Sequence, residues 1–147
     1  MIKVIAFSNQ KGGVGKTTSA VNIGAYLASQ GKRVLLIDLD PQANMTKGLG
    51  IEEPEISIYG VLLGEQKIKA FPIRENLVLV PGSYGMSSFE KVKGDDLDKE
   101  FLLKEVIDPL KPKFDFILLD CPPALGLITI NTLAAADQVY IPLEAQI

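Results

Sequence analysis

The sequence contains no histidine and no tryptophan, and its single cysteine is Cys121. Without histidine, the side chains of this chain cannot perform imidazole acid–base catalysis. One cysteine cannot form an internal disulfide, which makes a cytoplasmic location the natural expectation. Because Cys121 follows the aspartate of an apolar run, we expect a structural thiol rather than a reactive one, which would need an exposed, electropositive setting.

Long apolar runs are also missing. No segment approaches the roughly 20 apolar residues of a membrane-spanning helix, and the apolar run at 2–7 lacks the length and basic start of a secretory signal. The net charge of −3 gives no overall signal for nucleic-acid binding, although a local basic patch is compatible with that sum. With 47% hydrophobic residues, the 147 residues are expected to form one domain over 1–147.

A glycine-rich segment follows the first apolar run. It reads Lys11-Gly12-Gly13-Val14-Gly15-Lys16-Thr17-Thr18. Its glycines allow consecutive backbone N–H groups to turn toward a phosphate, and a helix opening near Gly15 would add its positive end. Lys16 would supply charge to the outer phosphates, and the Thr17 hydroxyl is a hard oxygen ligand suited to Mg²⁺. The segment predicts a nucleotide phosphate-binding loop; the alternative is a strand–helix turn that binds nothing.

Segments typical of strands and helices alternate along the chain. We expect strands over 2–7, 34–37, 77–80, 114–119 and 139–141, and helices over 16–30, 57–63, 97–107 and 126–136. This alternation predicts an α/β fold with a mostly parallel sheet covered on both faces. The stretches 52–55 and 65–76 are expected to be solvated connections, whereas 83–93 is either a helix or an ordinary surface segment.

Two aspartates are expected at strand ends, where ligands bind in parallel sheets. Asp120 ends an apolar strand, the arrangement in which a carboxylate holds a magnesium-bound water; a helix N-cap is the alternative. Asp38 ends another strand, and it could join the magnesium shell or have only a capping or solvating role. Asp40 follows in a loop and could equally begin a surface turn before Pro41.

The glycine-rich loop departs from the usual P-loop pattern at its start, where Gln10 stands in place of the first glycine and Lys11 adds a second lysine. With this extra lysine it resembles the deviant Walker A ATPases of the ParA/MinD superfamily. Three further segments fit that family: Asp38-Leu39-Asp40-Pro41-Gln42-Ala43-Asn44, Thr46-Lys47-Gly48-Leu49-Gly50 and Asp120-Cys121-Pro122-Pro123. The first is similar to ParA and Soj partitioning ATPases in particular, because MinD-like members usually continue differently after the second aspartate. The resemblance runs from Ile2 to the last residue.

The resemblance implies an α/β P-loop NTPase fold, a three-layer sandwich, and an ATP- and Mg²⁺-dependent ATPase. The residues implied for nucleotide binding are Lys11, Gly12, Gly13, Val14, Gly15, Lys16, Thr17 and Thr18; for the metal, Thr17, Asp38 and Asp120; and for catalysis, Lys11, Lys16 and Asp40. Asp40 would orient or polarise the attacking water, because a carboxylate with a pKa near ~4 is a weak base. Lys11 would reach into the ATP site of the other subunit of an ATP-dependent homodimer; binding phosphate within its own subunit is the alternative.

The resemblance also implies partners. Family members serve DNA segregation: they bind DNA without sequence preference and respond to a centromere-binding partner protein of the ParB type. No membrane partner is expected, and a cytoplasmic protein would be nucleoid-associated if it retains DNA binding. Members are normally longer, so the C-terminal elements, with most of the adenine pocket and the basic DNA-binding residues, are expected to be lacking, and one sheet edge to be open. The alternatives are a truncated nucleotide-binding interaction module without DNA binding and a MinD-like positioning ATPase.

Overall fold

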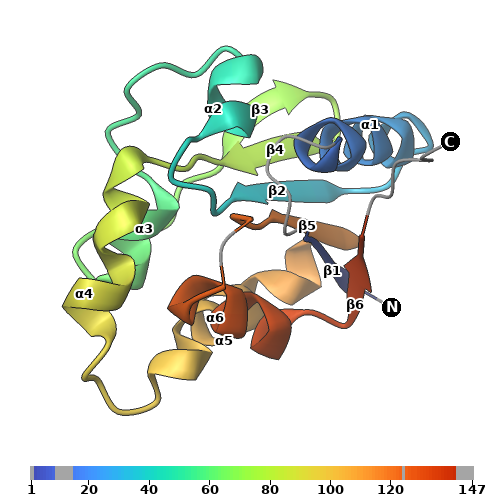
Figure 1. The fold of residues 1–147 in the computed structure, drawn as a ribbon. Helices are drawn as coiled ribbons and strands as arrows, with labels where there is room; N and C mark the ends of the chain where they lie inside the picture. Colours follow the sequence, from blue (N-terminus) through green and yellow to red (C-terminus); the bar gives the residue numbers. More distant parts are fainter. Residues whose placement is uncertain (1, 9–14, 124, 142–147) are drawn as a thin grey trace, which may run out of the picture.

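A computed structural model describes residues 2–8, 15–123 and 125–141 (Figure 1). The strands are β1 Lys3–Phe7, β2 Val34–Asp38, β3 Phe71–Arg74, β4 Leu77–Val80, β5 Phe116–Asp120 and β6 Gln138–Tyr140. The α-helices are α1 Lys16–Ser29, α2 Asn44–Gly48, α3 Ile58–Leu62, α4 Phe89–Lys93, α5 Leu102–Ile107 and α6 Leu127–Ala135. Three tighter 3₁₀ helices are η1 Tyr84–Ser88, η2 Lys99–Phe101 and η3 Asp108–Lys113.

The strands form one sheet in the order β3-β4-β2-β5-β1-β6. Every neighbouring pair is parallel except β3 and β4. This confirms the expected α/β fold with a mostly parallel sheet. β5 lies between β1 and β2, and its last residue, Asp120, is in register with Phe7 and with Asp38. The ends of these three central strands therefore meet at one edge, as ligand sites of parallel sheets require.

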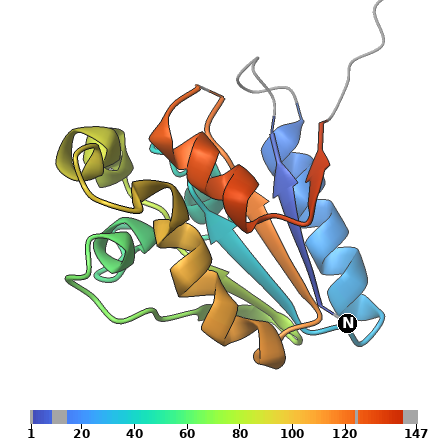
Figure 2. The same ribbon diagram turned by 90° about the horizontal axis from the view of Figure 1, so that it is seen from below.

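Helices cover both faces of the sheet, which gives three layers (Figure 2). On one face, α1 packs through a stripe of small residues, Ala20, Gly24 and Ala28. A Cβ atom at Gly24 would lie 3.0 Å from a methyl carbon of Leu36 in β2, so the small residues allow the helix to approach the sheet closely. On the other face, α3, α5 and α6 bury apolar side chains such as Leu103 against the sheet.

Most expected elements are present, with differences at edges and ends. The segment 65–76 was predicted as a solvated connection, and this is wrong for β3, an antiparallel edge strand that tolerates Pro72 because an edge position does not need every N–H. The helix expected over 97–107 begins only at η2, and Leu97 is 92% exposed. No helix within the described ranges is long and apolar enough to cross a membrane.

The opposite edge of the sheet is formed by β6. In the described part of the chain, β6 has a hydrogen-bonded neighbour, β1, on one side only, and its three residues are exposed. Apolar side chains are exposed nearby, including Ile141 beyond β6 and Ile130 and Leu133 on α6. Among the described residues, this edge of the sheet is therefore open, and exposed apolar side chains occur on β6 and α6.

Candidate functional site

The first turn of α1 lies at the edge where the central strands end. The helix begins at Lys16 and is preceded by Gly15, whose backbone is left-handed at φ +64° and which has no side chain to cap the helix. Glycine adopts this conformation without the steric cost that a side chain would add. A helix of 14 residues presents N–H groups and the positive end of its dipole at this point, which suits an anion. The predicted binding residues Lys11, Gly12, Gly13 and Val14 lie outside the described residues.

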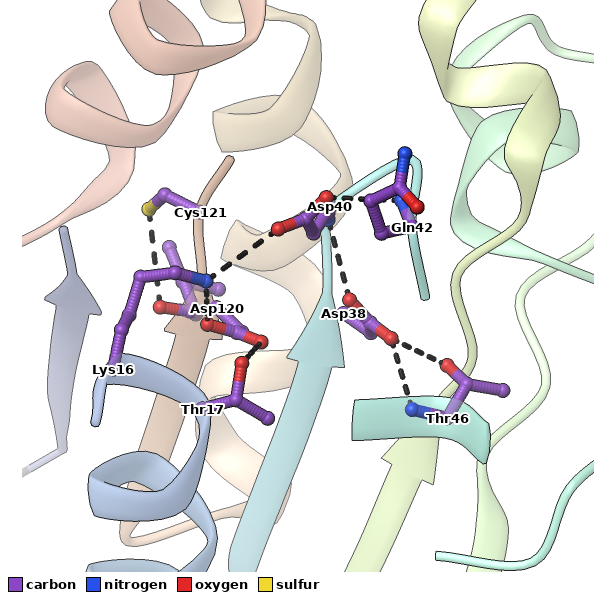
Figure 3. Close-up of polar contacts among 9 residues, drawn as sticks. Lys16, Thr17, Asp38, Asp40, Gln42, Thr46, Asp120 and Cys121 are labelled. Carbon is purple, nitrogen blue, oxygen red and sulfur yellow. Dashed lines mark hydrogen bonds and ion pairs between the residues drawn. The ribbon is translucent and has the colours of Figure 1, made fainter. Parts of the chain in front are cut away.

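Lys16, Thr17 and Asp120 form one contact group (Figure 3). The Lys16 ammonium donates a short hydrogen bond to Asp120 Oδ1, and the Thr17 hydroxyl donates to Asp120 Oδ2 at 2.8 Å. Lys16 is 4% exposed and Asp120 is fully buried, so the ion pair is shielded from water. Burial raises the pKa of the Asp120 carboxyl, and the Lys16 ammonium opposes that shift.

The sequence left a helix N-cap as the alternative role for Asp120. The helix that follows Asp120 is α6, so the contacts at the N-terminus of α6 test this alternative. The residue before α6 is Gly126, and the N–H of Leu127 donates to a carboxylate oxygen of Glu90, in α4, at 2.8 Å. Both oxygens of Asp120 are instead directed at Lys16 and Thr17. The cap is thus made by a residue that the sequence did not indicate, and Asp120 faces the candidate site.

Asp40 joins this group from the loop after β2. Its Oδ2 lies 3.7 Å from the Lys16 ammonium, and its Oδ1 accepts a hydrogen bond from the N–H of Gln42 at 2.9 Å. The side chain therefore begins a turn before Pro41 and also faces the predicted phosphate-binding lysine. The surface position expected for this turn is wrong, because Asp40 is only 6% exposed. Its role in orienting water stays a prediction.

Asp38 has different surroundings. Its Oδ2 accepts hydrogen bonds from the hydroxyl and N–H of Thr46, at 2.6 and 3.0 Å, and its Oδ1 accepts one from the N–H of Asp40 at 3.2 Å. The side chain is fully buried, which excludes a solvating role. Burial raises its pKa to about 6, although the hydrogen bonds from Thr46 lower it. Its part in the magnesium shell stays a prediction, and its present contacts are those of a buried loop anchor.

Cys121 follows Asp120 and is 1% exposed. Burial raises the pKa of its thiol to about 12, so it is protonated and unreactive at neutral pH. The prediction of a structural cysteine is confirmed.

A cavity of about 440 Å³ opens between α1 and α2 at this edge of the sheet, lined among others by Gly15, Lys16, Thr17 and Asp40. Lys16 and Thr17 of this lining contact Asp120 behind them, and the three together fit a magnesium ion with a phosphate chain, because Thr17 and Asp120 offer adjacent hard oxygens and Lys16 offers a cation. No cluster of three or more His, Cys, Asp or Glu side chains suited to a metal occurs among the described residues. Mg²⁺ commonly binds in such a setting, through one or two protein oxygens together with substrate phosphates and waters.

Sequence comparison relates the chain to a protein family and to curated relatives. The family model described as "AAA domain" matches residues 2–147. The chain is also 47% identical to the chromosome-partitioning ATPase Soj of Treponema pallidum, over 99% of this chain and 58% of that protein. The chain thus spans little more than half the length of this curated relative.

Solved protein structures also resemble this chain. A cobyrinic acid a,c-diamide synthase from Mycobacterium smegmatis with bound ADP and magnesium superimposes with a TM-score of 0.93 at 40% identity, over 97% of this chain and 60% of that one. A second structure of that protein holds an ATP analogue and magnesium. A plasmid partition protein from Borrelia burgdorferi matches with a TM-score of 0.88 at 34% identity, over 99% of this chain and 67% of that one.

Proposed function

This chain belongs to the ParA/Soj type of P-loop ATPases, and we propose from that premise that it binds ATP with Mg²⁺ and hydrolyses it to ADP and phosphate. ATP and Mg²⁺ are the cofactors that the site fits, and related structures hold ADP or an ATP analogue with magnesium. The observation that carries the proposal is the convergence of Lys16, Thr17, Asp40 and Asp120 at the N-terminus of α1.

Each side chain has a role that its position supports. Lys16 binds the outer phosphates and stabilises negative charge on the transferring group. Thr17 and Asp120 present the oxygens that hold the metal. Asp40 lies beside Lys16 and orients the attacking water by accepting a hydrogen bond from it. When bound, Mg²⁺ supplies additional positive charge that neutralises the phosphate oxygens.

A bound phosphate would compete with Asp120 for the Lys16 ammonium. In the present arrangement this ammonium is paired with Asp120 and faces Asp40, so nucleotide and carboxylates compete for the same cation. Asp120 then loses its counter-charge inside a buried site, which is costly unless another cation replaces it. Nucleotide binding is therefore expected to be strongly coupled to the metal.

The finer function that we propose is a dimerising switch in DNA segregation. ATP binding would join two copies, Lys11 of each copy would reach the phosphates of the other, and hydrolysis would separate them. In this proposal, DNA and a centromere-binding partner of the ParB type act on the dimer. The support is the likeness to Soj and to a plasmid partition protein, over 58% and 67% of their lengths.

Two measurements test the proposal. Phosphate release with ATP and Mg²⁺ tests hydrolysis, and it should vanish in Lys16→Met. Light scattering of Asp40→Ala, with and without ATP and Mg²⁺, tests the switch: an ATP-dependent doubling of mass is expected. Lys11→Ala should retain some ATP binding while losing both the dimer and turnover. Wild-type hydrolysis by Lys11→Ala would exclude its proposed role.

A second candidate is a nucleotide-binding interaction module without turnover. The observation that favours it is the self-contained pairing of Lys16 and Thr17 with Asp120, which occupies these groups without a nucleotide. Binding of a fluorescent ATP analogue without phosphate release would support the module. Release at a rate that depends on Asp40 would support the ATPase.

A further inference from the structure

We propose that Thr46 is a positioning residue for Asp40: its hydroxyl joins the end of β4 to Asp38 and thereby fixes the loop that carries Asp40. The catalytic consequence of this inference rests on the proposed ATPase function. The structural consequence, an ordered loop over 38–46, does not.

Thr46 lies at the centre of a buried polar group. Its hydroxyl donates to Asp38 Oδ2 at 2.6 Å and accepts from the N–H of Gly82 at 2.9 Å. Its own N–H donates to the same Asp38 oxygen at 3.0 Å. Thr46 is 1% exposed and Asp38 is fully buried, so water does not readily replace these contacts. A hydroxyl is needed here because one atom must donate and accept at once.

Gly82, just after β4, is shaped for this contact. A Cβ atom at position 82 would lie 2.6 Å from the carbonyl oxygen of Asp38 and 3.0 Å from its carboxyl carbon. The chain after β4 therefore passes against Asp38 at a distance that only glycine permits. This close approach brings the N–H of Gly82 to the Thr46 hydroxyl. The segment after β4 is therefore linked to α2 by a hydrogen bond to the side chain of Thr46.

The same group controls the loop between β2 and α2. Asp38 Oδ1 accepts from the N–H of Asp40 at 3.2 Å, and the carbonyl of Asp40 accepts from the N–H of Ala43 at 2.9 Å. Ala43 has a left-handed backbone with φ +52°, which an alanine adopts only at a steric cost. Contacts on both sides of Ala43 hold the loop in this shape. On the α2 side they are the contacts of Thr46 and a hydrogen bond from the N–H of Lys47 to the Ala43 carbonyl at 3.0 Å.

The test compares variants that differ only in the hydroxyl. Thr46→Val keeps the branched shape of the side chain and removes its hydroxyl, whereas Thr46→Ser keeps the hydroxyl. Thr132→Val is the matched control: Thr132 is also 1% exposed, and its hydroxyl donates to Ile128 one turn earlier in α6 at 2.8 Å. Asp38→Asn changes the acceptor of the Thr46 hydrogen bonds, and it replaces Thr46→Val in the test if that variant does not fold. Amide hydrogen exchange over 40–46 is measured on the nucleotide-free chain, and ATP turnover is measured with saturating Mg²⁺.

We expect exchange over 40–46 to accelerate about tenfold in Thr46→Val, while Thr132→Val and Thr46→Ser stay near the parent chain. Turnover should fall by about tenfold to a hundredfold in Thr46→Val, with the affinity for a fluorescent ATP analogue within about threefold, because a misplaced group slows the reaction without removing binding. Unchanged exchange over 40–46 in Thr46→Val or Asp38→Asn overturns the inference. If the parent chain hydrolyses no ATP, the proposed function fails, and the exchange measurement alone decides the role of Thr46.

Discussion

Asp38 and Asp120 occupy the same position on neighbouring strands and have different surroundings. They are in register at the ends of β2 and β5, and both are fully buried. Asp120 faces a lysine and a threonine from the first turn of α1. Asp38 faces the N–H and hydroxyl of Thr46, in α2. Asp120 lies against Lys16 and Thr17, which line the cavity, whereas Asp38 lies against Thr46 in α2 and against the loop that follows β2.

The difference shows that the helix covering a strand end decides which donors its carboxylate meets. A buried carboxylate beside a cation keeps its charge available for a ligand, whereas one surrounded by neutral donors becomes a structural anchor. Burial raises the pKa of both groups, but only Asp120 has a lysine opposing the shift at hydrogen-bonding distance. The following predictions test this division between a ligand-facing and a structural carboxylate.

The largest effect is expected at Lys16. Lys16→Met keeps much of the apolar stem and removes the cation, so both phosphate binding and the counter-charge of Asp120 are lost. We expect ATP turnover to fall by about a thousandfold. Lys47→Met is the control, because Lys47 lies exposed on α2. Steady-state phosphate release measures both; comparable rates in the two variants would contradict the assignment of Lys16.

Asp40 should affect chemistry more than binding. Asp40→Ala removes the group that we propose to orient the water, and we expect turnover to fall by about a hundredfold or more while the ATP analogue still binds. Single-turnover phosphate release compared with analogue affinity separates the two. A loss of affinity as large as the loss of rate would mean that Asp40 serves binding instead.

The two strand-end aspartates should differ in their effect on metal dependence. Asp120→Asn removes a proposed metal ligand, so the Mg²⁺ concentration needed for half-maximal nucleotide binding should rise about tenfold or more. Asp38→Asn should leave that concentration nearly unchanged, because its carboxylate contacts Thr46 and the N–H of Asp40. Magnesium titrations of analogue binding test this. Equal shifts in the two variants would place Asp38 in the metal shell, as the family resemblance implies.

The smallest effect concerns pH. Burial raises the pKa of folded Asp38 from 3.8 to about 6, so the folded chain holds a proton that the unfolded chain releases between these values. The stability from this proton is complete below about 4 and is lost as pH rises through about 6. From pH 5.5 to 7.5, we expect the free energy of unfolding to fall by roughly 1 kcal/mol relative to Asp38→Asn, which does not titrate. Urea unfolding of both chains at both pH values measures this change. A parent chain that becomes more stable relative to Asp38→Asn as the pH rises would contradict the prediction.

The sequence predicted most of the fold because its signals are local. Apolar runs marked the central strands, and Gly31 marked the end of α1, where it has the expected left-handed backbone at φ +84°. The antiparallel edge strand β3 was missed because a short half-exposed strand with a proline looks like a connection. Glu90 as the cap of α6 was also missed, since a contact across 37 residues leaves no local pattern.

For the site, the sequence by itself determined which residue types gather at the strand ends: a glycine, lysine and threonine opening α1, and aspartates closing β2 and β5. It favoured Asp120 as a magnesium residue and left Asp38 open between the magnesium shell and a capping or solvating role, because sequence spacing does not show which donors surround a carboxylate. Only the tertiary structure decided the surroundings of each, by placing Lys16 beside Asp120 and Thr46, held by Gly82, beside Asp38. The physical reason is that the charge and hydrogen-bonding of a buried carboxylate depend on donors brought to it by distant parts of the chain.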